Sequence, residues 1–233
     1  MFKEAFQVKE TQCIIIADKE QGIKTAVASI ARNRKTLEDY AKPNPLFLYT
    51  LEPVVAPAKP LVARLMAEAA EKANVGPMAA VAGVLADLAV KEMIADGCRV
   101  AVVENGGEVS AVSDRPVDVA LAAGDTPLSK RFGFRLTEFP KGVATSSGRF
   151  SHALSFGDAE AATVFCRDAG LADAAATAAG NVVKGEDCEA AVQRGIDKAL
   201  SIEGVEGVLI IYKGFTGTAG KIPQIIKVNP SSK

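Results

Sequence analysis

The sequence predicts an α+β fold in which helices pack against an antiparallel-rich sheet. Short β-branched runs follow one another between residues 100 and 165, segments of helical periodicity lie on both sides of them, and strands and helices do not alternate regularly. The 233 residues contain no low-complexity linker, and 48% of them are apolar. One core can therefore hold the chain 1–233 as a single domain.

At the beginning of the chain, the run 13–17 is short, β-branched and bounded by charged residues, which predicts a buried strand. Over 20–41, apolar residues recur at helical spacing with charged residues between them, so we expect an amphipathic helix that ends before Pro43. Five prolines lie between 43 and 60. Because proline interrupts helices, the apolar stretch 46–51 among them is expected to be an extended strand.

Two helices are expected next, over 60–73 and over 76–96. Pro60 is tolerated in the first turn of the first helix, and the second begins at Gly76-Pro77 and carries an apolar stripe. A glycine–proline entry gives a sharply started helix whose first amides can meet an anion. Core packing accounts equally well for the small residues that follow.

From Arg99 onward the sequence changes to short β-type runs. Strands are expected at 100–103, 109–112, 117–121, 134–139, 143–146, 161–165, 208–212 and 225–228. Helices are expected at 171–183 and 187–200. The segment 213–221 lacks one glycine and the terminal Ser or Thr of a P-loop, so we expect a flexible loop there.

Charge and composition exclude several classes of protein. With 27 basic and 28 acidic residues, the chain has no excess of cations for a nucleic-acid backbone. Its first seven residues carry charges where a signal peptide needs an apolar stretch, and no segment offers the ~18 consecutive apolar residues of a membrane span. We therefore expect a cytoplasmic protein with neither nucleic acid nor membrane as its partner.

Metal-binding side chains are few. The four cysteines are far apart in the sequence, and His152 is the only histidine. This composition excludes a multi-histidine zinc site and favours a hard cation bound by oxygen ligands.

The first segment that can carry chemistry is Asn105-Gly106-Gly107-Glu108, between two predicted strands. Paired glycines let a ligand approach exposed backbone amides, and the flanking Asn and Glu can hydrogen-bond a polar heterocycle or a ribose. A β-hairpin turn explains the same four residues, because Gly-Gly between strands is a standard hairpin signal.

The second segment is Thr145-Ser146-Ser147, at the end of a predicted strand. Three hydroxyls in a row can donate hydrogen bonds to phosphate oxygens, although hydroxyl-rich strand ends are also common turns. His152 follows five residues later and can act as an acid, a base or a phosphate donor. A packed or surface histidine is the simpler interpretation.

The third segment holds Asp173 and Thr177, which share one face of a predicted helix because they are four residues apart. A carboxylate and a hydroxyl are suitable ligands for Mg²⁺, which usually bridges to phosphates. The alternative is an acid that interacts with the helix dipole on a small-residue packing face, and such faces also form interfaces in homo-oligomers.

Taken together, these segments resemble ApbE-type flavin transferases. The helix segment Gly83-Val84-Leu85-Ala86-Asp87, the turn Asn105-Gly106-Gly107-Glu108 and the run Ala172-Asp173-Ala174-Ala175-Ala176-Thr177 occur in the order of that family's motifs. The sequence of residues 75–83 resembles that of an uncharacterised prokaryotic branch of ApbE-like proteins. The resemblance covers about residues 40–228.

For this chain, the resemblance implies a T-fold-like architecture, binding of FAD, and Mg²⁺-dependent transfer of FMN to a Ser or Thr hydroxyl of an acceptor protein. Asp173 and Thr177 would bind the metal, with a backbone carbonyl near Val81 as a third ligand, and Asp173 and His152 would be catalytic. The hydroxyls of 145–147 would line the pyrophosphate.

The chain departs from the family pattern at three places. The lysine before the helix glycine is Ala82, the acid after Gly-Gly is Glu108 rather than Asp, and the family's histidine segment is reduced to 152–157. These departures favour, as the alternative, a non-catalytic protein that binds a flavin or an adenine dinucleotide, such as an accessory protein of anaerobic sulfur or cofactor metabolism.

Overall fold

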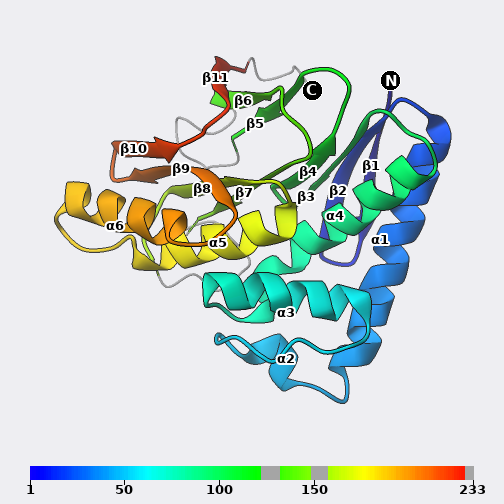
Figure 1. Ribbon diagram of the computed structural model, residues 1–233, viewed down its shortest axis with the longest axis horizontal. Coiled ribbons are helices and arrows are strands. Elements are labelled where there is room, and N and C mark those ends of the chain that lie inside the picture. The colour runs from blue at the N-terminus through cyan, green and yellow to red at the C-terminus, as the bar shows by residue number, and fades with distance from the viewer. Residues whose placement is uncertain (122–131, 148–156, 229–233) are drawn as a thin grey trace.

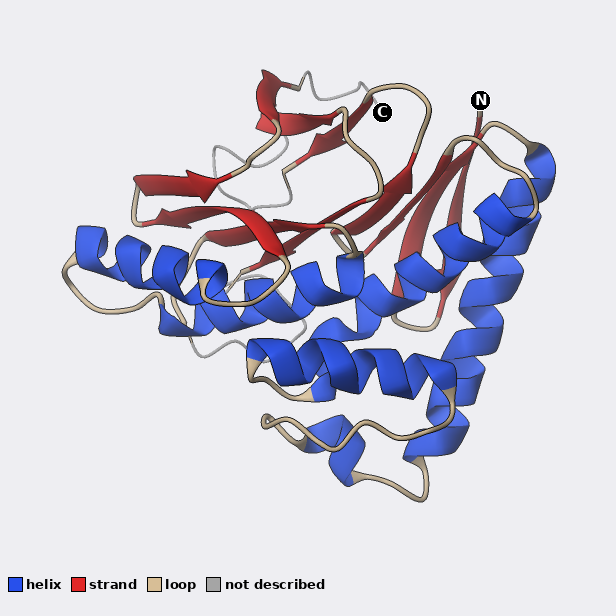
Figure 2. Ribbon diagram, viewed as in Figure 1, coloured by secondary structure: helices blue, strands red, loops and turns tan. Residues whose placement is uncertain are grey.

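The computed structural model describes residues 1–121, 132–147 and 157–228. Its centre is an eight-stranded antiparallel sheet with the strand order β1-β2-β3-β4-β7-β8-β9-β10. Helices cover one face of this sheet, and a three-stranded sheet of order β11-β6-β5 lies over the other face (Figures 1 and 2). The predicted α+β class with an antiparallel-rich sheet is confirmed.

The strands and helices have the following bounds. The large sheet contains β1 (Phe2–Val8), β2 (Thr11–Ala17), β3 (Ala101–Asn105), β4 (Glu108–Val112), β7 (Lys141–Ser146), β8 (Ala161–Cys166), β9 (Val205–Tyr212) and β10 (Phe215–Gly220). The small sheet contains β5 (Val117–Ala120), β6 (Phe132–Leu136) and β11 (Gln224–Lys227). The helices are α1 (Glu20–Ala41), α2 (Leu46–Tyr49), α3 (Leu61–Ala73), the 3₁₀ turn η1 (Pro77–Ala80), α4 (Val81–Ala95), α5 (Ala169–Val182) and α6 (Cys188–Leu200).

Strand alternation divides the core between the two faces of the large sheet. Ala144 and Val164 belong to the cluster that the helices cover. Their neighbours Val143 and Phe165 point to the opposite face, where Phe165 meets Phe134 of β6 edge to face at 4.8 Å between ring centroids. Every residue of β8 is buried because the strand is central and both of its faces are covered.

Two predictions about individual elements are wrong, and one strand was not predicted. The stretch 46–51 contains the short helix α2, because Pro45 provides its N-cap and only Phe47 is buried against the core. The segment 213–221 is not a loop, since Phe215–Gly220 pair with β9 as β10. The first strand, β1, was not expected, because its exposed and partly charged side chains show no alternation; it pairs with β2 at the edge of the sheet.

Helices α4 and α5 touch through backbone atoms. A Cβ atom placed on Gly83 would overlap the carbonyl oxygen of Ala169 and lie 2.8 Å from the amide nitrogen of Gly170. A Cβ atom on Gly170 would lie 2.6 Å from Cγ2 of Val84. Glycine is therefore required on both sides of this contact.

Within the described residues, no helix is both long enough and apolar enough to cross a bilayer.

Candidate functional site

One face of α5 stays partly open to solvent although the rest of the helix is buried. Asp173, Thr177 and Asn181 are half-buried, and they follow one another at four-residue spacing. We call these three residues the α5 stripe. The structure therefore places Asp173 and Thr177 on one accessible face, as their spacing predicted.

Asp173 meets the N-terminus of α4. The amide of Gly83, in the first turn of that helix, donates a hydrogen bond of 3.0 Å to Oδ2 of Asp173. The carboxylate is densely surrounded, and burial raises its pKa to about 7, with the charge of Asp87 adding to the rise and the amides of Gly83 and Ala82 opposing it. The helix N-terminus that meets an anion is therefore that of α4, which begins at Val81 after the separate 3₁₀ turn Pro77–Ala80, and the anion is Asp173 itself.

Glu108 brings a second acid to the same place. It is the first residue of β4 and lies on the helix-covered face, as Ser110 two residues later does. Burial raises the pKa of Glu108 well above its ordinary value, and the negative charge of Asp173 raises it further. Two carboxyl groups from distant parts of the chain therefore share a poorly solvated site in which a cation would relieve their repulsion.

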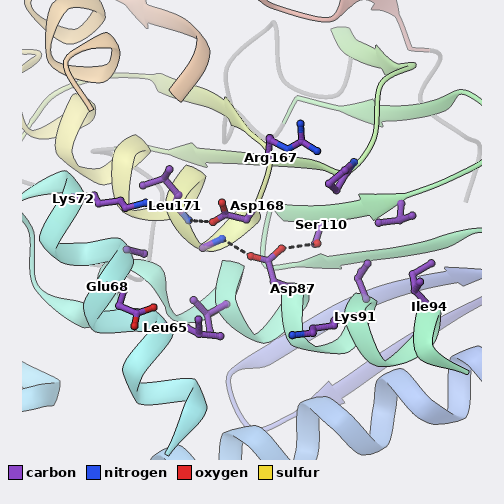
Figure 3. Close-up of a pocket in the computed structure, with 16 residues that line it drawn as sticks. Leu65, Glu68, Lys72, Asp87, Lys91, Ile94, Ser110, Arg167, Asp168 and Leu171 are labelled. Carbon is purple, nitrogen blue, oxygen red and sulfur yellow. Dashed lines mark hydrogen bonds between the residues drawn. The ribbon is translucent and has the colours of Figure 1, made fainter. Parts of the chain in front are cut away.

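Asp87 forms the counterpart of Asp173 at the other end of the contact between α4 and α5. Its carboxylate accepts hydrogen bonds from the hydroxyl of Ser110 at 2.6 Å and from the first amides of α5, those of Ala169 at 3.0 Å and Gly170 at 2.8 Å (Figure 3). Each helix thus supplies the acid that caps the N-terminus of the other. Burial nevertheless raises the pKa of Asp87 to about 6.

This role of Asp87 was missed from the sequence. The sequence did contain a signal, because two short segments of similar sequence each join a glycine to an acid. They are Ala82-Gly83-Val84-Leu85-Ala86-Asp87 and Ala169-Gly170-Leu171-Ala172-Asp173. The two glycines form the helix contact, and the two acids form the caps.

The Gly-Gly segment is a tight hairpin. Gly106 and Gly107 connect the paired residues Asn105 and Glu108 with φ values of 70° and 118°, so the two-residue turn needs glycine at both positions. The amide of Gly106 donates to the carbonyl of Gln12 at 3.0 Å, and that of Gly107 donates to Glu104 at 2.7 Å. The expectation of exposed amides is therefore wrong, because both are used within the protein.

The side chain of Asn105 also stabilises the fold. Its buried side chain donates from Nδ2 to the carbonyl oxygen of Ala82 at 3.0 Å, which ties β3 to the first turn of α4. The hairpin thereby holds Glu108 in position against the α5 stripe.

The three hydroxyls of 145–147 do not form one row. Thr145 points to the sheet face opposite the helices, where its hydroxyl hydrogen-bonds that of Thr163 at 2.9 Å. Ser146 faces α5, and a Cβ atom on Gly180 would lie 3.4 Å from its Oγ. Ser147 is only 6% exposed, and its Oγ has no hydrogen-bond partner among the described residues. A buried hydroxyl without a partner is costly, so Ser147 is the better candidate for a ligand contact.

His152 lies outside the described residues, so its predicted place near the hydroxyls stays a prediction.

The residues around Asp173 determine which kind of cation the site can hold. Within the described ranges, no three residues of the types His, Cys, Asp and Glu gather closely enough to bind a metal ion. The expected ligands are of another kind: the Asp173 carboxylate, the Thr177 hydroxyl one turn later, and a backbone carbonyl. Oxygen donors of mixed type beside a second acid fit Mg²⁺, which needs few protein ligands.

Comparison with known proteins adds independent evidence. A family model described as AbpE bacteria matches residues 3–206. A UPF0280 protein of Methanococcus vannielii is 38% identical, over 97% of this chain and 94% of its own. Two solved structures share the fold: the apo flavinyl transferase ApbE of Pseudomonas stutzeri, with TM-score 0.62, 14% identity and 94% of each chain covered, and the ApbE protein of Thermotoga maritima, with TM-score 0.58, 13% identity, and 97% of this chain and 96% of its own covered.

The family model spans most of the chain, and the fold matches both ApbE structures over 94% or more of this chain. The chain therefore belongs to the AbpE bacteria family.

Proposed function

We propose that this protein binds FAD together with Mg²⁺ along the α5 stripe and transfers FMN to a Ser or Thr hydroxyl of an acceptor protein. The observation that carries the proposal is the juxtaposition of Asp173 and Glu108. These two acids, from α5 and from the β3–β4 hairpin, have raised pKa values in a site that solvent still reaches. Such clustered, perturbed acids are typical of functional sites.

Each residue has a role in this proposal. Asp173 and Thr177 hold the metal, with a backbone carbonyl near Val81, and Glu108 adds negative charge beside it. Ser146 and Ser147 bind oxygens of the pyrophosphate, which would give the hydroxyl of Ser147 the partner that it lacks among the described residues. When bound, Mg²⁺ neutralises charge on the transferred phosphoryl group.

Four residues of the predicted set act differently. Asn105, Gly106 and Gly107 position Glu108 through the hairpin rather than contacting the ligand with their amides, and Thr145 lies on the far face of the sheet. His152 remains the candidate for a proton acceptor.

The proposed reaction balances without an oxidant or a reductant. The acceptor hydroxyl oxygen forms a bond with the FMN phosphorus, and the phosphoanhydride bond to AMP breaks. AMP leaves, and the hydroxyl proton passes to a base. The flavin transferase named among the solved structures supports this reaction class by its fold alone.

A second candidate function is binding without turnover. It is favoured by Ala82, which stands where the family motif has a lysine and so removes one positive charge near the phosphates. A protein that retains the flavin but does not cleave it would act as a carrier or accessory protein.

Incubation of the purified protein with FAD and Mg²⁺, followed by chromatography of the nucleotides, tests the proposal. The chain contains no tryptophan, so flavin fluorescence can be followed without indole emission. We expect FAD binding, release of AMP in the presence of an acceptor, and loss of both in Asp173→Asn. A matched control is Asp187→Asn, which alters the cap of α6 through the amide of Ala190, away from the stripe.

The outcomes separate the candidates. Tight FAD binding with no AMP across a panel of acceptors supports the accessory role. No FAD binding in the presence of Mg²⁺ rejects both candidates. Equal binding by the wild type and Asp173→Asn rejects flavin transfer at the α5 stripe and leaves the accessory role.

A further inference from the structure

A cavity of about 550 Å³ opens beside Asp87, between α3, α4, β4 and the start of α5 (Figure 3). We propose that this Asp87 cavity is a second ligand site, which binds a small amphipathic organic anion. Its volume lies within the range of pockets for small molecules. The ligand class follows from the walls and from the charges at its rim.

The walls of the Asp87 cavity are mainly apolar. Leu65 of α3, Val84 and Val90 of α4, and Leu171 of α5 converge on it from three helices. Ile94 extends the apolar surface toward the C-terminal end of α4. These side chains would enclose an aliphatic or aromatic body and remove it from water.

The acids that line the cavity all have partners. Asp87 accepts three hydrogen bonds, and Asp168 accepts one of 2.8 Å from the amide of Leu171. Glu68 lies 3.7 Å from Nε of Arg64 on the same helix. The first two acids also lie at the N-terminus of α5, where the helix dipole compensates negative charge. Each of these acids is thus already engaged by a donor within the protein.

The cations that line the cavity are not paired. Lys72, Lys91 and Arg167 come from α3, from α4 and from the connection between β8 and α5, and all three are exposed. Across the ranges that the structure describes, none of the three makes a hydrogen bond or an ion pair. Arg167 is the one described arginine of which this is true, since the others contact carboxylates or carbonyls. Together these three cations, which lack partners within the described residues, can contact the head group of an anion.

This site is separate from the flavin site. The contact between Gly83 and Gly170 lies between Asp87 and Asp173, and neither Asp173 nor Thr177 lines the cavity. A ligand here therefore does not require that the proposed flavin transfer be correct. Its head group, a carboxylate or a phosphate, would lie among the three cations while its body fills the apolar interior.

Titration with 1-anilinonaphthalene-8-sulfonate tests the proposal, because this dye joins an aromatic body to an anionic group and fluoresces when it leaves water. The titration uses the full chain, and the difference between variants at the rim isolates the dye that is bound in the Asp87 cavity. We expect saturable binding that weakens about three-fold in Arg167→Gln and again in Lys91→Gln, the scale of partly exposed ion pairs. Lys184→Gln, which removes an exposed charge far from the cavity, is the matched control and should bind as the parent does.

The neutral dye N-phenyl-1-naphthylamine and two competitors complete the experiment. We expect the neutral dye to respond equally to all variants. Displacement by octanoate identifies a carboxylate ligand, and displacement by octyl phosphate alone identifies a phosphate ligand. The proposal is overturned if Arg167→Gln and Lys91→Gln bind the anionic dye as Lys184→Gln does, or if neither competitor displaces it.

Discussion

The replacement Gly83→Ala tests the helix contact on which the candidate site is built. A methyl group at this position would overlap the carbonyl oxygen of Ala169, so α5 would have to move away from α4. That movement would also lengthen the 3.0 Å hydrogen bond between the amide of Gly83 and Asp173. Gly83→Ala should therefore disturb both the packing of α4 against α5 and the geometry around Asp173.

The size of the effect follows from three terms. Overpacking costs about 1–3 kcal/mol, and loss of a hydrogen bond to a charged group costs about 1.5–3 kcal/mol. Alanine regains about 1 kcal/mol because it favours the helix more than glycine does. We expect a net loss of about 2–4 kcal/mol in the free energy of unfolding, measured by urea denaturation followed by circular dichroism.

Gly180→Ala is the matched control on α5. Its new Cβ atom would lie 3.4 Å from Oγ of Ser146, an ordinary contact, so the helix preference of alanine should leave stability unchanged or raise it by up to about 1 kcal/mol. Equal stability of Gly83→Ala and Gly180→Ala would refute the close contact of α4 and α5.

Three further predictions concern the site. Burial raises the pKa of Asp173 from 3.8 to about 7, so ionisation opposes folding, and the stability of the wild type should fall as pH rises through this interval and level off above it. Asp173→Asn should make this fall smaller, by at most about 4 kcal/mol, in urea titrations at pH 4 and pH 8, while the part that comes from the raised pKa values of Asp87 and Glu108 remains; a parallel pH profile in both proteins would contradict the assignment. Ser147→Ala should raise stability by about 1 kcal/mol, because it removes a buried hydroxyl that has no partner among the described residues, yet weaken FAD binding in a fluorescence titration, and unchanged affinity would exclude Ser147 from the site. Ala82→Lys should tighten FAD binding severalfold at low salt, with the gain lost in high salt, and a gain that persists in high salt would show a cause other than charge.

The long helices could be predicted from the sequence because each has a strong apolar period. This holds for α1, α3 and α6, whose buried faces contact the rest of the protein while their charged faces meet water. The edge strands could not be predicted in the same way. Side chains of β1 are exposed on both faces, and β10 consists largely of Gly, Thr and Ala, so both strands form through backbone pairing with a neighbour.

The candidate site was predictable only where it depends on local spacing. Because Thr177 comes four residues after Asp173, the two share one helix face wherever the helix packs. The meeting of Asp173 with Glu108, and with the amide of Gly83, depends on the packing of segments 65 and 90 residues apart along the chain. The hydrogen bond from the amide of Gly106 to the carbonyl of Gln12 was hidden for the same reason.

The central claim is that the α5 stripe is a metal-dependent flavin site. The most direct test is the dissociation constant of FAD, measured by flavin fluorescence with and without Mg²⁺, in the wild type and in Asp173→Asn. We predict that Mg²⁺ tightens FAD binding to the wild type at least tenfold and leaves binding to Asp173→Asn unchanged. An equal response of the two proteins to Mg²⁺, or none in either, would contradict the claim.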